Sequence, residues 1–315
     1  FIGVRKKFYI LSAVIIIIGL GSIALRGFSY GVDFSGGRSY VVRFDQDVNT
    51  LDIRASLQNA LGETPEVKTF GPNTQVKITT RYLIDDDSAQ ADSLAERKIY
   101  EAVADFFTSP VTYSEFTSDD DAKVIGRLSS QKVGPTVARD IKIGAVISVI
   151  IALIIIFIYI AIRFNKWQFG VGGLISLAHD PIIVISLYSL LHNIVPWTME
   201  IDQIFIAAIL TIIGYSINDT VVIFDRLREN MTLFPKRDVK TNMNLALNST
   251  LSRTFNTSAT TLVVLLIIFL FGGEVIRGFS FALMIGIAVG TYSSLFIATP
   301  IAYDFLMRKK NKKTH

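Results

Sequence analysis

One stretch decides the fold of this protein, and it reads Ile213-Gly214-Tyr215-Ser216-Ile217-Asn218-Asp219-Thr220-Val221-Val222-Ile223-Phe224-Asp225-Arg226-Leu227-Arg228-Glu229-Asn230. It ends an apolar run that begins near Ile204 and is long enough to cross a lipid bilayer. Asn218 and Asp219 lie within that run, well before the charged cluster that ends it. An ionisable side chain inside a membrane helix costs about 2.5–3.5 kcal/mol on insertion scales. Asp219 is therefore a candidate functional residue.

The composition is that of a membrane protein. Of the 315 residues, 50% are hydrophobic and only 18% are charged, whereas soluble domains contain about 25% charged residues. The chain has no cysteine, which excludes disulfides, thiol nucleophiles and cysteine metal sites. The net charge of +4 is unevenly spread, because most basic residues flank hydrophobic runs. This pattern reports membrane topology and gives no reason to expect nucleic acid as a partner.

Six apolar runs predict six membrane-spanning helices. The chain does not begin with Met, and its first run follows Arg5-Lys6-Lys7 without a small-residue cleavage site after it, so we interpret that run as a retained helix and not a signal peptide. The predicted spans are 8–25, 141–162, 169–191, 203–224, 251–271 and 278–306. The resulting domain organisation is an N-terminus with the first span (1–26), a folded domain outside the bilayer (27–140), the remaining spans (141–306) and a basic tail (307–315).

The polar segment 27–140 predicts an α+β domain. Apolar periodicities and turn residues indicate strands at 40–44, 66–70 and 75–79, helices at 50–61 and 92–107, and a last strand somewhere in 111–125. The order βαββαβ is that of the ferredoxin-like arrangement.

The distribution of Lys and Arg predicts the orientation. Both chain ends and the segments at 163–166 and 226–240 are basic, whereas the links at 192–202 and 272–277 are not. The positive-inside rule then places both ends in the cytoplasm and the 27–140 domain on the other side of the cytoplasmic membrane.

Asp219 and Arg253 are predicted to lie at the same depth. Asp219 is 16 residues from the start of its span at Gln203, and Arg253 is 18 residues from the end of its span at Phe271. At about 1.5 Å per residue both lie roughly 24–27 Å from the outer face. They could pair, either as a structural ion pair that fixes helix register or as part of a proton site, with Asn218 beside them.

Further polar residues lie in the other spans. His179 and Asp180 are near mid-bilayer in the third span, where the alternative to proton transfer is interhelical hydrogen bonding for His179 and a satisfied polar group at a helix break before Pro181 for Asp180. Thr257 and Thr260 belong to a Ser/Thr stripe in the fifth span, for which packing is the alternative to a proton path. Gly286 and Gly290 form a GxxxG pair, which favours close helix packing.

Several kinds of chemistry are missing from the sequence. It contains no P-loop for nucleotide binding, no metal-binding histidine motif and no hydrolase triad. We therefore expect no cofactor, no metal and no enzymatic activity. An ion gradient acting on intramembrane carboxylates remains as the energy source within the chain.

At this point the motifs resemble those of the SecF family, the smaller partner of SecD in bacterial protein export and a member of the RND superfamily. The resemblance covers nearly the whole chain. It rests on Gly31-Val32-Asp33-Phe34-Ser35-Gly36-Gly37 after the first span, Ala178-His179-Asp180 in the third, Tyr215 to Glu229 in the fourth, Leu251-Ser252-Arg253-Thr254 with Thr257-Ser258 in the fifth and Gly290-Thr291-Tyr292-Ser293-Ser294 in the sixth. Pro181 departs from the family pattern, which has an aliphatic residue there.

The resemblance implies half of an RND-type transporter, with SecD, separate or fused upstream of Phe1, as the other half. It implies that the pair associates with the SecYEG channel and a translocating preprotein and uses the proton-motive force, with Asp219 and Arg253 at positions used for proton conduction. Sodium is an alternative coupling ion, since carboxylate, Asn and Thr oxygens also suit it. The alternative functions are a non-conducting scaffold subunit of the translocon and an RND exporter of small molecules.

Overall fold

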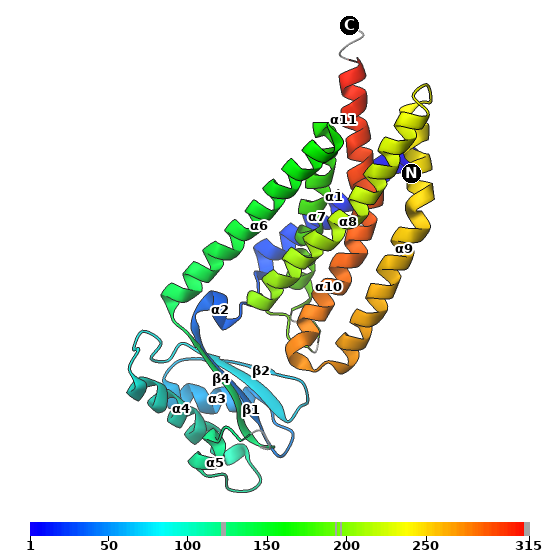
Figure 1. Ribbon diagram of the computed structural model, residues 1–315. Helices are drawn as coiled ribbons and strands as arrows, with labels where there is room; N and C mark the ends of the chain where they lie inside the picture. Colours follow the sequence, from blue (N-terminus) through cyan, green and yellow to red (C-terminus); the bar gives the residue numbers. More distant parts are fainter. Residues whose placement is uncertain (121–123, 193, 196, 312–315) are drawn as a thin grey trace. The chain divides into compact units, whose positions relative to one another are not determined.

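The computed structural model describes residues 1–120, 124–192, 194–195 and 197–311 of the chain. The protein divides into two compact units. The helical unit comprises residues 1–29, 145–194 and 204–315, and the α+β unit comprises residues 30–144 and 195–203. Each unit has its own hydrophobic core, and the elements of both are labelled in Figure 1.

Within the described residues, six helical segments are long and apolar enough to cross a membrane, which confirms the predicted number. Their helices are α1 (Arg5–Arg26), α6 (Pro135–Phe164), α7 (Trp167–Leu191), α8 (Gln203–Leu233), α9 (Val239–Phe271) and α10 (Glu274–Ser293), the last continued by a π-helical turn (Ser294–Ala298) and α11 (Thr299–Asn311). A 3-10 turn, Ile2–Val4, precedes α1.

Several helices extend beyond their predicted spans. The basic segment 226–240 is largely helical, because α8 continues to Leu233 and α9 begins at Val239. Charged residues end an apolar run without ending a helix, so hydropathy underestimates helix length. The predicted basic tail lies only partly within the described residues, since 312–315 fall outside them. The salt bridge from Arg5 Nε to Asp304 Oδ1, at 2.9 Å, holds the start of α1 against α11.

α7 is largely buried, and it runs without interruption through Pro181. The helix break considered at Asp180 is therefore not present. Proline removes one backbone N–H from the helix ladder, but neighbouring helices enclose this part of α7, and Pro181 itself is buried. Packing keeps the chain helical where the local sequence alone would favour a break.

Gly286 and Gly290 allow α10 to approach α8 closely, as their GxxxG spacing predicts. A Cβ on Gly286 would overlap the side chain of Ile212, and one on Gly290 would lie 3.0 Å from Cβ of Ser216. By contrast, α6 has a largely exposed surface of Ile and Val, as expected of a helix that faces lipid.

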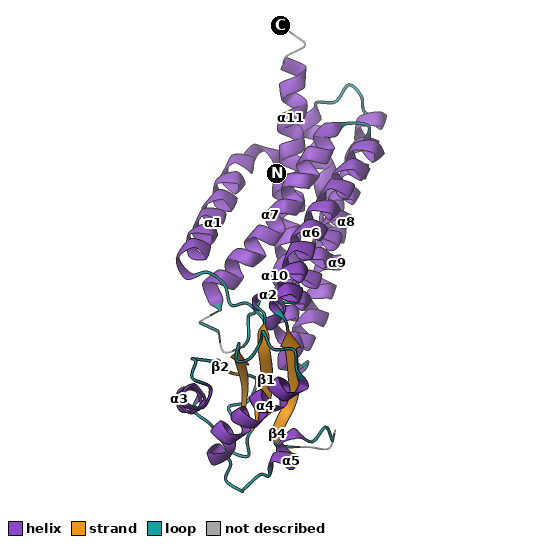
Figure 2. Cartoon of the chain, turned by 90° about the vertical axis from the view of Figure 1, so that its left-hand side faces the viewer, coloured by secondary structure: helices purple, strands orange, loops and turns teal. Residues whose placement is uncertain are grey.

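The α+β unit has the predicted βαββαβ order. Its elements are α2 (Val32–Ser35), β1 (Gly37–Arg43), α3 (Thr50–Leu61), β2 (Glu66–Thr69), β3 (Gln75–Thr80), α4 (Ala89–Val103), a 3-10 turn (Ala104–Phe106), α5 (Tyr113–Thr117) and β4 (Gly126–Val133). The strands form one antiparallel sheet in the order β2-β3-β1-β4, with Tyr40 opposite Ile78 on one side and Ser130 on the other (Figure 2).

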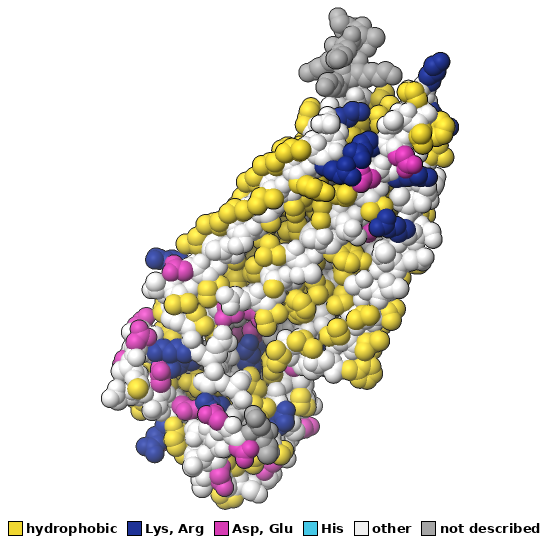
Figure 3. All heavy atoms as spheres, in the orientation of Figure 1, with side chains coloured by type: hydrophobic (Ala, Val, Ile, Leu, Met, Phe, Trp, Pro, Cys, Tyr) yellow, Lys and Arg dark blue, Asp and Glu magenta, His cyan; other side chains and the backbone are white. Residues whose placement is uncertain are grey.

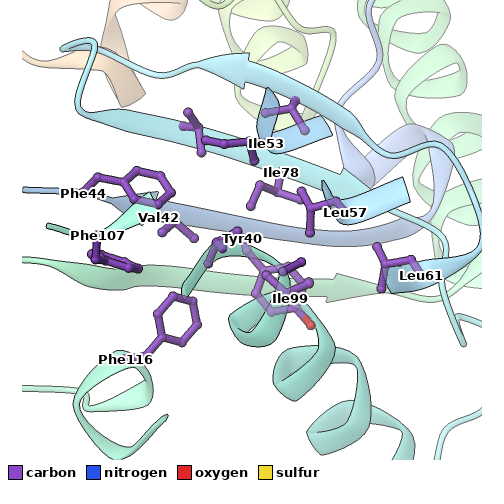
Figure 4. Close-up of a cluster of buried hydrophobic side chains, with 14 residues drawn as sticks. Tyr40, Val42, Phe44, Ile53, Leu57, Leu61, Ile78, Ile99, Phe107 and Phe116 are labelled. Atoms are coloured by element: carbon purple, nitrogen blue, oxygen red, sulfur yellow. The ribbon is translucent and has the colours of Figure 1, made fainter. Parts of the chain in front are cut away.

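The core of this unit lies between the sheet and two helices. Alternate residues of β1 point to one face, where Tyr40 and Val42 meet residues of α3 and α4 such as Leu57 and Ile99, together with Phe44, which directly follows the strand (Figure 4). The predicted helix 50–61 matches α3, and Asn49 caps it by accepting from the N–H of Leu51.

The position predicted for the last strand is wrong. The structure places β4 at Gly126–Val133, whereas the interval 111–125 contains α5, which a capping box of Thr112 and Glu115 begins. Residues 121–123 of that interval lie outside the described residues. β4 lacked a strand signal because it is an edge strand whose central side chains are exposed and polar. α4 also begins and ends three or four residues earlier than predicted, with Ser88 as its cap.

Part of the link predicted at 192–202 belongs to the α+β unit. We call residues 197–203 the strap. Tyr30 and Ile201 form a parallel β-bridge, and the N–H of Gly31 donates to the carbonyl of Ile201 at 3.1 Å. The buried carboxylate of Glu200 forms a 2.5 Å salt bridge with Nζ of Lys77 in β3. The strap ends at Gln203, the first residue of α8.

Candidate functional site

Asp180 is the centre of a buried polar network in the helical unit. Its side chain is fully buried in α7. Oδ2 accepts a hydrogen bond of 2.6 Å from the hydroxyl of Ser216 in α8, and Oδ1 lies 3.0 Å from Nδ1 of His179. Buried carboxylates require such partners, so α7 and α8 are joined here by a hydrogen bond as well as by packing.

The network continues from His179 into α1 and α10. Nε2 of His179 lies 3.2 Å from the hydroxyl of Ser12, which lies 2.9 Å from the hydroxyl of Tyr292. Tyr292 donates its only hydroxyl hydrogen to the carbonyl of Phe8 at 3.1 Å. Ser12 must then donate to Tyr292, and Nε2 of His179 must donate to Ser12.

The order of donors limits where protons can be bound on His179 and Asp180. With Nε2 protonated, the contact between Nδ1 and Oδ1 is a hydrogen bond only if one further proton is bound, either on Nδ1 or on the carboxyl group. The pair is then electrically neutral as a whole, which suits its burial. Two titratable groups that share a proton are suited to pass one on.

The network also extends along α8. Ser294 donates to the carbonyl of Ser216 at 3.3 Å, and Thr220 lies 2.9 Å from the Ser294 hydroxyl. Ser294 is the first residue of the π-helical turn that follows α10. Such turns often occur at functional sites, and this one places a hydroxyl between two residues of the stretch that contains Asp219.

Asp219 lies between Ser216 and Thr220 in α8 and is 4% exposed. Its Oδ2 is buried and has no hydrogen-bond partner among the residues that the structure describes. Arg253 interacts with it electrostatically, but no salt bridge joins the two in the described part of the chain. Buried carboxylate oxygens without a donor are uncommon, so this oxygen is available to bind a proton or cation.

The remaining intramembrane candidates point away from this network. Asn218 and Arg253 are exposed, and so are Asn256 and Thr260, while Thr257 is half-buried. The hydroxyls of Thr257 and Thr260 donate to backbone carbonyls of α9 itself. The buried face of α9 instead carries residues such as Thr250, Thr254 and Ser258. The stripe that contains Thr257 and Thr260 therefore lies largely on a face of α9 that this chain leaves uncovered.

The motif after the first span lies in the α+β unit. Gly36 and Gly37 have φ angles of +68° and +143°, which favour glycine, and they lead from α2 into β1. Asp33 accepts from the side chain of Gln131 at 2.8 Å and from the N–H of Gln203 at 3.2 Å. It thus satisfies a free backbone donor at the start of α8.

Sequence reasoning missed Ser12, Ser216, Tyr292 and Ser294 as members of the network. Serine in a membrane helix usually bonds to its own backbone, so its presence alone does not predict a role. Ser216 and Ser294 lay within motifs that had been singled out, but only the packing of α7, α8 and α10 gives them their partners.

The chain is similar to known proteins of one family along nearly its whole length. Residues 114–308 match the family model "Protein export membrane protein SecD/SecF, C-terminal", and residues 21–48 match the "SecD/SecF GG Motif". The chain is 43% identical over 308 residues to the protein translocase subunit SecF of Rhodothermus marinus, covering 98% of this chain and 93% of that protein. It is 39% identical to SecF of Haemophilus influenzae, covering 99% and 87%.

A solved structure supports the fold. The crystal structure of SecDF from Thermus thermophilus, described as a translocon-associated membrane protein, superimposes with a TM-score of 0.79 at 31% identity. The alignment covers 97% of this chain and 38% of that chain. Both the resemblance seen in the motifs and the predicted fold class are thereby confirmed.

Proposed function

Because this chain belongs to the SecF family of protein translocase subunits, we propose that it couples the proton-motive force to the completion of protein export, together with SecD and the SecYEG channel. It acts as a transport component and not as an enzyme. The translocating preprotein is its substrate, and the cytoplasmic membrane is its location.

The observation that supports this proposal is the state of Asp219. Its buried Oδ2 has no hydrogen-bond partner among the described residues, and the same helix presents hydroxyls of the Asp180 network on either side of it. Intramembrane carboxylates in such surroundings are typical of proton pathways.

In this mechanism Asp219 binds a proton from one side of the membrane and releases it to the other. Arg253 acts on Asp219 electrostatically and is the basic residue in this mechanism. The proton shared by His179 and Asp180 provides a second store on the neighbouring helix. A change of charge at Asp219 acts on α8. Because α8 begins at the strap, the α+β unit is connected to this site through the chain.

The uncovered face of α8 and α9 is where SecD would bind. It carries small or polar residues such as Ala207, Thr211, Gly214, Asn218 and Asn256, all exposed in this chain. Lipid-facing surfaces such as that of α6 are apolar, whereas helix interfaces in membranes are rich in small and polar residues. A partner half placed there would complete the surroundings of Arg253 and Asn218.

The orientation follows from charge. With both termini in the cytoplasm, the basic ends of α6, α8 and α11 lie on the side that the positive-inside rule favours. The α+β unit then lies on the outer side, where it can contact the emerging preprotein.

The test uses Asp219→Asn in the full chain co-expressed with SecD. Export into inverted membrane vesicles is measured with SecYEG present, with and without a proton gradient. We expect Asp219→Asn to abolish the gradient-dependent part of export. Asp304→Asn is the matched control, because Asp304 is half-exposed at the end of the helical unit and pairs with Arg5; it should retain at least half of that part.

The outcome separates the alternatives. Retention of gradient-dependent export by Asp219→Asn refutes the coupling role and leaves a scaffold subunit. Export by wild type that responds to a sodium gradient and not to a proton gradient identifies sodium as the coupling ion. Transport of a small hydrophobic dye without SecYEG would instead indicate an RND exporter.

A further inference from the structure

A charged pocket opens where the last turns of α6 and α8 meet the first half of α9. Its volume is about 780 Å³. It is lined by residues of all three helices, namely Arg163, Val222, Asp225, Arg226, Arg228, Glu229, Thr232, Leu233, Ser249, Thr250 and Arg253. Four of these are arginines and two are carboxylates, so the lining carries an excess of two positive charges. Figure 3 shows Lys and Arg side chains gathered at this end of the helical unit.

The two carboxylates do not neutralise the arginines. Arg163 and Arg228 share Asp225 at 3.2 and 3.1 Å, and Arg226 pairs with Glu229 at 2.7 Å. Arg253 forms no salt bridge with any residue that the structure describes. The guanidinium groups also remain accessible, since the side chains of Arg163, Arg226 and Arg228 are 40–46% exposed.

The depth of the pocket identifies the anion that fits it. At about 1.5 Å per residue from Gln203, Asp225 lies roughly 33 Å and Arg228 roughly 38 Å along α8. The hydrocarbon core of a bilayer is about 30 Å thick, and headgroups extend it to about 40–45 Å. Arg226 and Arg228 therefore lie at the level of lipid headgroups, on the membrane face that also carries both chain ends, and Arg253 lies deeper, roughly 27 Å from the outer face.

The chemistry of the lining also favours a lipid. Guanidinium groups bind phosphate oxygens in a bidentate manner. Val222 and Leu233 add apolar side chains to the lining of the pocket. A free phosphate would use only the charged part of this surface, whereas a phospholipid uses both.

We propose that this pocket binds the headgroup of an anionic phospholipid, with Arg226 and Arg228 contacting its phosphodiester and Arg253 contributing positive charge below it. Basic pockets between membrane helices are suited to such headgroups. The inference goes beyond the export function and does not require proton transfer by Asp219. It does give lipid composition a route to that site, because the anion would offset the charge that Arg253 presents to Asp219.

The experiment uses the full chain co-expressed with SecD, placed in nanodiscs of equal parts phosphatidylglycerol and phosphatidylcholine. Native mass spectrometry counts the lipids that remain bound after release. We expect wild type to retain phosphatidylglycerol preferentially, and R226Q/R228Q to lower that preference roughly thirtyfold, since each basic residue near a membrane surface contributes about 1 kcal/mol.

K236Q/K240Q is the matched control. It removes the same charge from exposed residues that do not line the pocket, and it should change the preference less than twofold. R226K/R228K keeps the charge and should retain an intermediate preference, which separates loss of binding from loss of fold.

Three results would overturn the proposal. The first is an equal loss in the control, which would mean diffuse surface attraction. The second is no preference in wild type. The third is displacement of the retained lipid by an excess of inorganic phosphate, which would identify a free-anion site. None of these depends on whether Asp219→Asn impairs export.

Discussion

The hydroxyl of Ser216 donates a 2.6 Å hydrogen bond to Oδ2 of Asp180, and this contact joins α8 to α7 one helical turn before Asp219. Ser216 and Asp219 are three residues apart and both buried, so their side chains lie on neighbouring positions of one helix face. Ser216 thus binds the carboxylate of Asp180 and lies one helical turn from the carboxylate of Asp219. Its position makes it the most direct test of whether the network serves proton transfer.

Ser216→Ala leaves an oxygen of Asp180 without its hydroxyl donor. We expect a loss of about 1 kcal/mol in the free energy of unfolding and a roughly fivefold decrease in gradient-dependent export, because the network is interrupted beside Asp219. Thermal unfolding and vesicle export measure the two effects. Ser22→Ala is the control, since Ser22 and Ser189 form a buried 3.1 Å hydrogen bond outside the network. Equal export in the two variants would show that the network is structural only.

Gly214→Ala tests the uncovered face of α8. A Cβ at Gly214 meets nothing within 4 Å in this chain, and alanine is favoured over glycine in a helix by about 1 kcal/mol. In the absence of SecD, the variant should therefore be at least as stable as wild type. It should bind SecD at least fivefold more weakly, because the added methyl group separates α8 from the helix of SecD that contacts it. Co-purification at increasing detergent concentration measures this.

Gly144→Ala provides the comparison for that experiment. Gly144 also has open space around it, but it lies in α6 among residues that face lipid. Its substitution should leave association with SecD unchanged. If both variants bind SecD as wild type does, the partner contacts another face.

Glu200→Gln should loosen the strap. The Glu200 side chain is only 5% exposed and its carboxylate lies 2.5 Å from Nζ of Lys77, and hydrogen bonds to charged groups contribute about 1.5–3 kcal/mol. The N–H of Gly31, which donates to Ile201, should exchange with solvent at least tenfold faster. Hydrogen exchange followed by mass spectrometry measures this. Glu66→Gln, which breaks an exposed pair with Lys68 in the same sheet, should change the rate less than fivefold.

Acid should destabilise the α+β unit in part through Asp92. Hydrogen bonds from Arg38 and Lys132 hold the pKa of Asp92 below its usual value of 3.8. A lowered pKa in the folded state stabilises the fold above the usual value, and this contribution is lost as the pH falls through the lowered one. Unfolding should therefore become easier below about pH 4.

Asp92→Asn should weaken that acid sensitivity and lower stability at neutral pH. Fluorescence of Trp197, which belongs to this unit, reports its unfolding in a Trp167→Phe background. Asp47→Asn is the control, because Asp47 is exposed and has no side-chain partner among the described residues. If the acid transitions of the two variants coincide, Asp92 makes no such contribution.

Local patterns were sufficient for most of the fold. The six spans follow from apolar runs, because a bilayer requires a fixed length of apolar helix. α3 follows from apolar periodicity and a polar cap, and the packing of Gly286 and Gly290 against α8 follows from their spacing. β4 could not be predicted in this way, because an edge strand is held by its neighbour's hydrogen bonds and not by its own side chains.

From the sequence alone we could predict that Asp219 has a high free energy of insertion into the bilayer and that it lies near the depth of Arg253. An ion gradient followed as the energy source to consider. These predictions were possible because the free energy of burying a charge depends on residue type and depth. The groups that surround Asp219 could not be predicted in this way, because they depend on the tertiary structure. It brought Ser216, Asp180 and His179 together, and it turned Arg253 and Asn218 toward a surface that this chain leaves open. Hydrogen bonds and partner faces depend on the rotation of each helix about its axis, and that rotation is fixed by packing between helices distant in sequence.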